Sequence, residues 1–400
     1  MNVKTLLGLG LVAAILVLAG LLFVEGDAPP AGTAVEGERV FPGLYDRVNE
    51  IESLTVATPD GEFTIQRQDD AWGLAERAGY PVVFENVRST LVGLAELELV
   101  ERKTDNPDLY GKLGVQPVTP GDSSETPARS LTARGPGGEV LAALIVGKAR
   151  QGGTGATYFA RKPGEAASWL VSGDRPQLPD SGDDWLDKKI LEVQRSDVRA
   201  GRIVHADGEV VSLAKEDADT DYGVLELPAD RELKYASVAG SVAGSMQYLN
   251  FEDVKPIADF ERPEVATSVV HLWTRDGMRV TAEVFALDDE TTWAVFGASY
   301  DAEGAPALPA PVGPVPGDEP VAQASATPRP EAEVRAEAAA LDARVSPWAY
   351  QLPQYSRANF TKRLEDLLKP LPEETEDEGT AGDASPLDAL EGAAPPADGE

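Results

Sequence analysis

The chain has 400 residues, of which 68 are acidic and 35 are basic, so its formal net charge at pH 7 is −33. A charge of this size and sign argues against binding nucleic acid or anionic lipid through a broad basic face. The chain contains no cysteine, which excludes disulfides, thiolate catalysis and cysteine-ligated zinc or iron–sulfur centres.

An uninterrupted apolar run begins at Thr5 and ends at Val24. About 20 apolar residues are needed to cross the roughly 30 Å hydrocarbon core of a bilayer, so this run predicts a transmembrane helix. Lys4 precedes it and Glu25 follows it, which predicts that residues 1–4 are cytoplasmic and the bulk of the chain lies outside. The alternative is a cleaved signal peptide, but the apolar region of a signal peptide is usually about 7–15 residues long. We therefore expect an uncleaved anchor.

The chain after the anchor divides by composition. Residues 25–44 are rich in Pro, Gly and Ala, which is typical of a flexible stalk. The following chain is long enough for two domains of about 100–200 residues each, which we place at residues 45–195 and 196–370. From residue 371 to 400 every charged residue is acidic and no residue is aromatic, so we expect a disordered acidic tail.

The first of these two domains, residues 45–195, opens with a pattern typical of β-strands. Apolar residues alternate with polar ones on both sides of Asp60-Gly61, which predicts a β-hairpin. Val87, Leu91 and Leu94 then recur at helical spacing and predict an amphipathic helix over residues 85–97. Short apolar stretches between turn residues follow and predict an antiparallel meander, with strands at residues 140–146, 158–161 and 169–172. A short capping helix is expected at residues 184–191.

The same order of elements recurs further along the chain. Asp207-Gly208 lies 147 residues after Asp60-Gly61, and Tyr222-Gly223 lies 150 residues after Trp72-Gly73. The second repeat then predicts an amphipathic helix over residues 235–246, a second meander and a final helix over 357–368. Residues 301–346 form a Pro/Ala-rich insertion in it, whose composition indicates a mobile linker with a candidate helix at residues 331–344.

These patterns together define the expected fold class. We expect an α+β protein in which an N-terminal transmembrane helix is followed by two tandem repeats of antiparallel β-meander and hairpins. Each repeat is expected to pack against one amphipathic helix, because an apolar face of a sheet must be covered.

Three motifs carry a resemblance to a known family: Trp72-Gly73-Leu74, the stretch LYGKLGV at residues 109–115, and Tyr158-Phe159-Ala160-Arg161 followed by WLV at residues 169–171. With the apolar N-terminal span, they resemble the DUF4340 family of bacterial membrane-anchored proteins over residues 45–368. The resemblance implies a bacterial envelope protein associated with ABC-type transport systems of the gliding-motility kind. It implies no activity and no cofactor. In the second repeat residues 254–257 replace the LYGKLGV stretch, so a site built there would exist in one copy.

No set of residues predicts a catalytic, cofactor or metal site. His205 and His271 each lie in a predicted strand, and the nearby Asp207 and Asp276 are explained as turn residues of Asp-Gly hairpins. The acidic cluster at residues 180–184 offers oxygen ligands for Ca²⁺, but it lacks the EF-hand spacing. We expect Asp183 and Asp184 of this cluster to cap the short helix that follows.

The tryptophans are the remaining candidates for a binding surface. Most of the six lie at repeat-equivalent strand positions, which favours packing in the core. Trp72, Trp185 and Trp293 would mark a ligand or partner surface if their rings were exposed.

The expected function is that of a non-enzymatic interaction module. It would be tethered by a single span to the bacterial inner membrane, with the bulk of the chain in the periplasm, beside a component of an ABC-type transport system or another envelope assembly. Open strand edges in the meanders would offer places for a partner strand. The alternative is a periplasmic protein that binds a small ligand or glycan in the cleft between the repeats. A hydrolase ranks third, because it requires a buried carboxylate or His–carboxylate pair.

Overall fold

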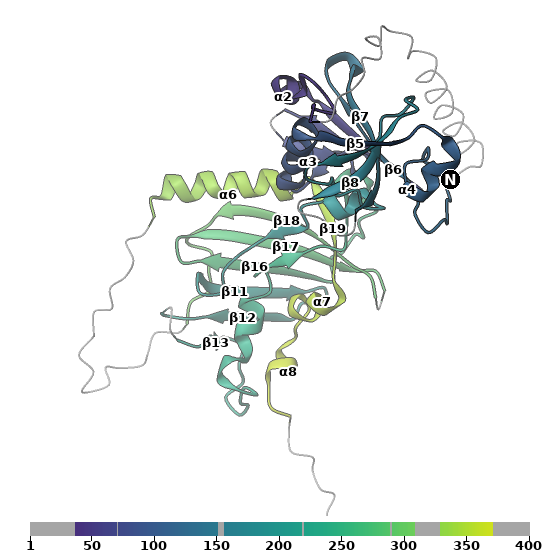
Figure 1. Ribbon diagram of the computed structural model, residues 1–400. Coiled ribbons are helices and arrows are strands. Elements are labelled where there is room, and N and C mark those ends of the chain that lie inside the picture. Colours follow the sequence, from purple (N-terminus) through teal and green to yellow (C-terminus); the bar gives the residue numbers. More distant parts are fainter. Residues whose placement is uncertain are drawn as a thin grey trace, which may run out of the picture.

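The computed structural model describes residues 37–69, 71–150, 156–217, 220–288, 290–308 and 329–370. The predicted membrane span from Thr5 to Val24, most of the predicted stalk and the acidic tail lie outside these residues. Within the described part of the chain, no helix has the length and apolar character that crossing a bilayer requires. The described chain is α+β, with antiparallel sheets and few helices (Figure 1).

The N-terminal part of the fold, here called unit 1 (residues 37–187), is built on one nine-stranded antiparallel sheet. Its strand order is β4-β3-β2-β1-β6-β7-β8-β9-β5. The strands are β1 (Ser53–Thr58), β2 (Gly61–Gln68), β3 (Ala71–Leu74), β4 (Tyr80–Pro81), β5 (Glu98–Thr104), β6 (Arg129–Arg134), β7 (Val140–Ala149), β8 (Thr157–Arg161) and β9 (Ser168–Ser172). The helices are α2 (Leu44–Arg47), α3 (Phe84–Glu96) and α4 (Tyr110–Leu113), with 3-10 turns η1 (Val48–Glu50), η2 (Ala75–Arg77), η3 (Pro107–Leu109), η4 (Pro136–Gly138) and η5 (Gly182–Trp185).

The hairpin β1–β2 shows how alternation builds the core of unit 1. Leu54 pairs with Ile65 and Val56 with Phe63, and all four side chains are buried. Because successive side chains in a strand point to opposite faces, these four residues share one face of the sheet. Helix α3 lies between β4 and β5 in the chain and buries its apolar stripe in the same core.

The C-terminal part, here called unit 2 (residues 198–370), is built on an eight-stranded antiparallel sheet. Its strand order is β13-β12-β11-β16-β17-β18-β19-β15. The strands are β11 (Val198–His205), β12 (Val210–Ala214), β13 (Gly223–Val224), β15 (Asp253–Pro256), β16 (Ser268–Thr274), β17 (Met278–Ala286), β18 (Thr292–Tyr300) and β19 (Trp348–Leu352). The helices are α5 (Gly240–Ala243), α6 (Glu331–Val345), α7 (Gln354–Phe360) and α8 (Leu364–Leu367), with 3-10 turns η6 (Ala236–Ala239) and η7 (Ile257–Asp259).

The two sheets share one strand order. Reading β1, β2, β3 and β5–β9 as the counterparts of β11, β12, β13 and β15–β19 makes the two orders identical, with β4 as an addition in unit 1. The turns differ between the units. Gly208 and Gly277 in the Asp-Gly turns of unit 2 have φ of 91° and 94°, a conformation that glycine adopts without strain, whereas Gly61 of unit 1 has φ of 151° and already pairs with Thr58 in the hairpin.

Three expected helices differ in the structure. Residues 184–191 end the turn η5 and then form the strand β10 (Lys189–Leu191), because β14 (Leu249–Asn250) provides a pairing partner. Residues 235–246 form only η6 and α5, where Gly240 and Gly244 interrupt a good helix sequence and admit the Arg195 side chain against the backbone. Residues 357–368 break into α7 and α8 at the extended Arg363.

Helix α6 lies on the β18 edge of the sheet of unit 2 (Figure 1). Strand β19 pairs with β18 only along Thr292–Val295, and further along β18 the amide of Ala298 donates to Asp342 Oδ1 of α6 at 3.0 Å. Val334 and Ala338 of α6 are buried in the core. The candidate helix at residues 331–344 is therefore confirmed as α6, whereas the prediction of a mobile linker is wrong for this segment, because α6 covers a sheet edge. Residues 309–328 lie outside the described residues.

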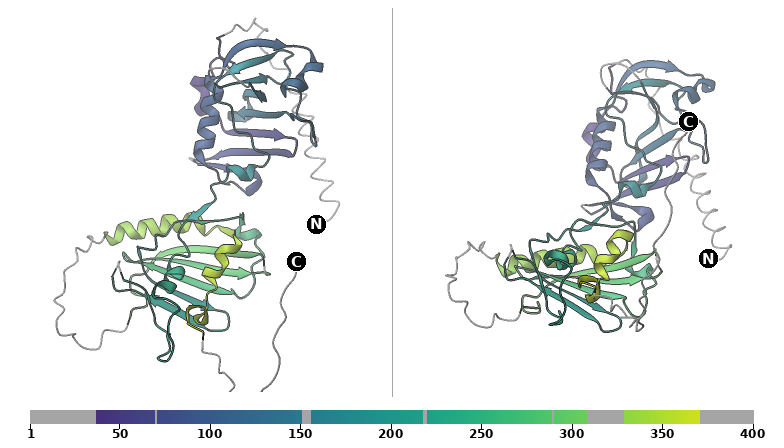
Figure 2. Two further views of the ribbon diagram at one scale, coloured as in Figure 1. Left: turned by 60° about the horizontal axis from the view of Figure 1, so that its bottom comes forward. Right: turned by 90° about the horizontal axis from the view of Figure 1, so that it is seen from below.

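The units meet at one end of each (Figure 2). There β10, which follows unit 1, pairs with β14 of unit 2, and the Phe251 amide donates to the Lys188 carbonyl at 3.1 Å. The Tyr80 ring of β4 makes edge-on contacts with Trp348 and Phe251, with ring centroids 4.9 and 5.2 Å apart. The core is continuous from one unit to the other.

The packing of α6 predicts the effect of charge on its buried face. Ala338→Asp places a carboxylate at a position that is 1% exposed, so we expect a loss of about 2–4 kcal/mol in the free energy of unfolding. Ala339→Asp is the matched control, because Ala339 is exposed on the same helix. Denaturant titration of both variants measures the difference, and equal effects of the two would contradict the packing of α6.

Candidate functional site

The three tryptophans singled out from the sequence all face the interior. Trp72, Trp185 and Trp293 are 8%, 2% and 4% exposed. Trp72 and Trp185 belong to the main core, and Trp293 stacks on Phe260 in a smaller cluster on unit 2. None of these rings presents a face to solvent, so a surface recognised through exposed tryptophan does not exist at these positions.

The two histidines lie in neighbouring strands and have separate partners. His205 in β11 is buried, and its Nε2 lies 3.1 Å from the Lys362 carbonyl. His271 in β16 is half-buried, with Nδ1 at 2.9 Å from Thr281 Oγ1, and burial lowers its pKa, helped by the charge of Arg279. Asp207 accepts a hydrogen bond from the Glu209 amide within its turn, at 3.1 Å. Each of these groups is explained by strand and turn structure.

The acidic cluster at residues 180–184 is divided among arginines. Arg77 holds Asp183 through two hydrogen bonds of 2.8 and 2.5 Å, and its Nη1 also lies 3.0 Å from Asp253 Oδ1 at the start of β15. Arg77 therefore ties unit 1 to unit 2. The expected cap is also different, since it is Ser181 Oγ that accepts from the Asp183 amide, at 3.2 Å. Among the described residues no group of acids or histidines has the arrangement of a metal site.

Strand β5 forms the outer edge of the sheet of unit 1. Residues 37–40 run beside its first part, where the Leu99 amide donates to the Glu38 carbonyl at 2.9 Å and the Val40 amide donates to Leu97 at 2.8 Å. Residues 100–103 are exposed, and the described chain places no further strand outside them. On the inner side the register with β9 skips Val100 and Lys103.

The other sheet edges of the described residues are short or covered. Strands β4 and β13 have two residues each, and β15 has four and ends at Pro256, which cannot donate a ladder hydrogen bond. The free part of β18 lies under α6. The second half of β5 is thus the most accessible strand edge in the described chain.

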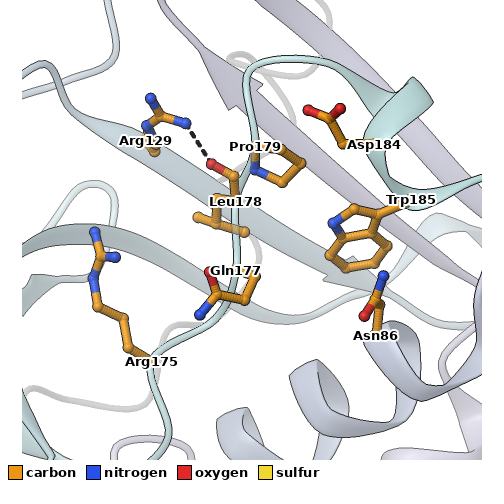
Figure 3. Close-up of a pocket in the computed structure, with 8 residues that line it drawn as sticks. All are labelled: Asn86, Arg129, Arg175, Gln177, Leu178, Pro179, Asp184 and Trp185. Carbon is orange, nitrogen blue, oxygen red and sulfur yellow. Dashed lines mark hydrogen bonds between the residues drawn. The ribbon is translucent and has the colours of Figure 1, made fainter.

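A pocket of about 420 Å³ opens on unit 1 between α3, the start of β6, the segment after β9 and η5 (Figure 3). Two arginines lie on one side of it. Arg129 donates to the Leu178 carbonyl at 2.5 Å and lies 2.7 Å from Asp180 Oδ1. Arg175 donates to the Gly147 carbonyl at 3.2 Å. Asp184 lies on the opposite side, above the ring of Trp185.

The electrostatics of the pocket centre on Arg175. Partial burial lowers the pKa of its guanidinium, nearby Tyr158 opposes this, and the positive charge of Arg129 adds to it. Arginine nevertheless stays charged, because its ordinary pKa is above 12. The Tyr158 hydroxyl close by is buried and has no hydrogen-bond partner among the described residues. Two like charges are therefore held close together, with one carboxylate pairing only one of them.

A comparison with models of known protein families tests the resemblance to DUF4340. Residues 72–264 match the family model DUF4340, a domain of unknown function. This part of the chain belongs to the DUF4340 family. No curated protein matches the chain.

The DUF4340 match extends from β3 of unit 1 to the residues before β16 of unit 2. It is narrower than the extent of residues 45–368 that the motifs suggested. It contains the pocket of unit 1, strand β5 and the β10–β14 junction, so all three belong to the DUF4340 part of the chain.

The LYGKLGV stretch of the DUF4340 domain has a structural role. Tyr110 is buried on the outer face of the sheet, with the Arg161 guanidinium 4.5 Å from its ring centroid. Residues 254–257 do not replace this stretch, because they form β15 and the start of η7. The buried aromatic residue that follows the edge strand in unit 2, as Tyr110 does in unit 1, is Phe260.

Sequence reasoning missed Arg129 and Arg175. Their one signal is that they are basic residues at the two ends of a predicted meander in a strongly acidic chain. That they converge follows from the strand order, which brings the start of β6 near the segment after β9 in space although the two are 46 residues apart.

The Arg77–Asp183 pair predicts a pH dependence. Hydrogen bonds from Arg77 hold the pKa of Asp183 below its ordinary value of 3.8. A lowered folded-state pKa stabilises the fold above the unfolded pKa, and this contribution is lost as the pH falls through the folded value. Asp183→Asn should therefore cost about 1 kcal/mol or less at pH 7, and the difference from wild type should shrink as the pH falls below 3.8 and through the lowered pKa of Asp183.

Denaturant titrations at a series of pH values test this. Asp184→Asn serves as the neighbouring control, because that carboxylate is exposed and pairs with no lysine or arginine of the described residues. If the Asp183→Asn deficit stayed constant down to pH 2, the pairing with Arg77 would not be its cause.

Proposed function

We propose that this chain is a non-enzymatic interaction module, tethered to the bacterial inner membrane by residues 5–24 with residues 1–4 cytoplasmic and the bulk of the chain periplasmic. It works beside an envelope assembly, such as a component of an ABC-type transport system. The tether is supported by the length and charge flanks of the apolar run, and the association is supported by the family resemblance.

The observation that carries this proposal is the open edge of β5. The other edges of the described sheets are short, end in proline or lie under a helix, devices that proteins use against unwanted strand pairing. Along β5 the described residues cover only the part beside residues 37–40. Residues 37–40 are part of the predicted stalk, so the chain that leads from the proposed tether runs along the first part of β5.

A partner strand added to β5 would gain main-chain hydrogen bonds, each contributing a net free energy of about 1 kcal/mol. The side chains would supply selectivity. One acidic and two basic side chains are exposed there, those of Glu101, Arg102 and Lys103, and Lys103 Nζ lies 2.6 Å from Glu101 Oε2. The edge thus rejects an apolar strand and accepts one with complementary charges.

The second candidate is a protein that binds a small ligand or glycan. The predicted cleft between the units does not support this candidate, because the rings of Tyr80, Phe251 and Trp348 pack there. The three candidate tryptophans do not support it either, because they are buried. The pocket of unit 1 favours this candidate instead.

Proline at the edge tests the leading proposal. Lys103→Pro removes a backbone N–H at a position without a register partner on β9, so unit 1 should fold while strand addition is blocked. We expect full-length Lys103→Pro protein, cross-linked in intact membranes, to lose the envelope partner that wild type captures, at least about tenfold.

Lys103→Ala is the matched control, since it removes the same side chain and keeps the N–H. It should retain the partner. Retention by Lys103→Pro, or the absence of any stable envelope partner of the wild-type protein, would contradict the proposal.

A further inference from the structure

We propose that the pocket of unit 1 binds a small zwitterion, an amino acid or short peptide, with its carboxylate on Arg175 and its amine on Asp184. This goes beyond the interaction module proposed above, because it uses a different face of unit 1 from the edge of β5. The pocket volume of about 420 Å³ lies within the usual range of ligand pockets, about 300–1,000 Å³.

Arg175 is the group suited to a carboxylate. Arg129 already has a carboxylate partner in Asp180 and a carbonyl partner in Leu178. Among the described residues, Arg175 donates only to the Gly147 carbonyl, at 3.3 Å from Nε and 3.2 Å from Nη2. These are long hydrogen bonds to a neutral group, whereas a guanidinium binds a carboxylate with two short parallel ones. The charge of Arg175 is therefore available to a ligand.

Asp184 is the group suited to an amine. Its neighbours in the acidic cluster are paired, Asp180 with Arg129 and Asp183 with Arg77. Asp184 is exposed, and no lysine or arginine of the described chain pairs with it. It sits at the end of η5, which is fixed by the burial of the next residue, Trp185.

The middle of the pocket is apolar with amides beside it. Leu178 and Pro179 lie between Arg175 and Asp184 in Figure 3, and Gln177 and Asn86 border the same space. An aliphatic side chain of a ligand would pack against Leu178 and Pro179. The two side-chain amides would serve its peptide group, because an amide both donates and accepts.

Charge balance favours a zwitterion over a simple anion. Arg129 and Arg175 are opposed by Asp180 and Asp184, so the four groups around the pocket sum to zero. A phosphate dianion would add net negative charge next to Asp184 in a protein that is already strongly acidic. A zwitterion leaves the sum unchanged and gives each unpaired group a partner.

Unit 2 provides an internal comparison. A hollow of unit 2 between η6–α5 and α7 is bordered by Arg195, Ser241, Gln247 and Asn359. It therefore has one arginine in its lining, where the pocket of unit 1 has two. In the ladders, Ser268 at the start of β16 takes the position of Arg129, and its hydroxyl donates to the Phe360 carbonyl at 2.8 Å. A serine is thus sufficient to hold the segment that follows β19 in unit 2. Arg129 and Arg175 of unit 1 are more than is needed to hold the segment after β9, which indicates a role in binding.

Isothermal titration calorimetry on the purified full-length chain tests the proposal with four probes: the dipeptide Ala-Leu, its N-acetyl form, its C-terminal amide, and inorganic phosphate. We expect Ala-Leu to bind, and either modification to weaken binding about 10–100-fold, the contribution of a charged hydrogen-bonded pair. Phosphate should not compete with the dipeptide.

Two variants assign the ends of the ligand. In Arg175→Ala, free and amidated dipeptides should bind equally weakly. In Asp184→Asn, free and N-acetylated dipeptides should bind equally. Asn359→Ala, in the hollow of unit 2, is the matched control and should leave all affinities unchanged. Thermal unfolding checks that each variant is folded, and Arg175→Lys, which keeps the charge without the planar fork, replaces Arg175→Ala if that variant unfolds.

The proposal is overturned if Ala-Leu does not bind, if the modified dipeptides bind wild type as tightly as the free one, or if phosphate displaces the dipeptide. Loss of binding in Asn359→Ala together with unchanged binding in Arg175→Ala would also overturn it, since the site would then be in unit 2.

Discussion

The contact on which the rest of the structure depends is the packing of Tyr80 of unit 1 against the rings of Phe251, Trp348 and Tyr350 of unit 2. Edge-to-face aromatic pairs contribute about 0.5–1.5 kcal/mol beyond the area they bury. Burial raises the pKa of both tyrosines, that of Tyr350 to about 12, so both hydroxyls stay neutral at physiological pH. With β10 paired to β14 and Arg77 bound to Asp253, the two sheets share one core instead of being joined by a linker.

Within that shared core, the two units have specialised from one plan. Their strand orders correspond, yet each has a feature that the other lacks. Unit 2 carries α6 on the edge of β18, whereas no described residue of unit 1 covers the second half of β5. Unit 1 carries Arg129 where unit 2 has Ser268. The binding features that we propose, an edge for a partner and a pocket for a small ligand, thus both lie in unit 1, and unit 2 supports it through the junction.

The spacing of apolar and turn residues in the sequence predicted the hairpins and helices that depend on contacts between residues close in the chain. Alternation around Asp60-Gly61 predicted the hairpin of β1 and β2, and helical spacing predicted α3 to within a residue or two. Prediction failed where tertiary contacts prevail, as at residues 189–191, which find a strand partner 60 residues away. Composition predicted a helix at residues 331–344 but not its packing, because two valines and one alanine are enough to bury one face of α6 against the sheet. The convergence of Arg129 and Arg175 depends on strand order, which no local pattern contains.

The most direct test of a shared core is the cooperativity of unfolding. Wild-type full-length protein in a denaturant titration should unfold in one transition that is reported alike by far-UV circular dichroism and tryptophan fluorescence. Tyr80→Ala removes the central ring of the junction and should split the curve into two transitions, while Tyr235→Ala, at an exposed position, should leave it single. Two separate transitions in the wild-type protein, unaffected by Tyr80→Ala, would contradict the account.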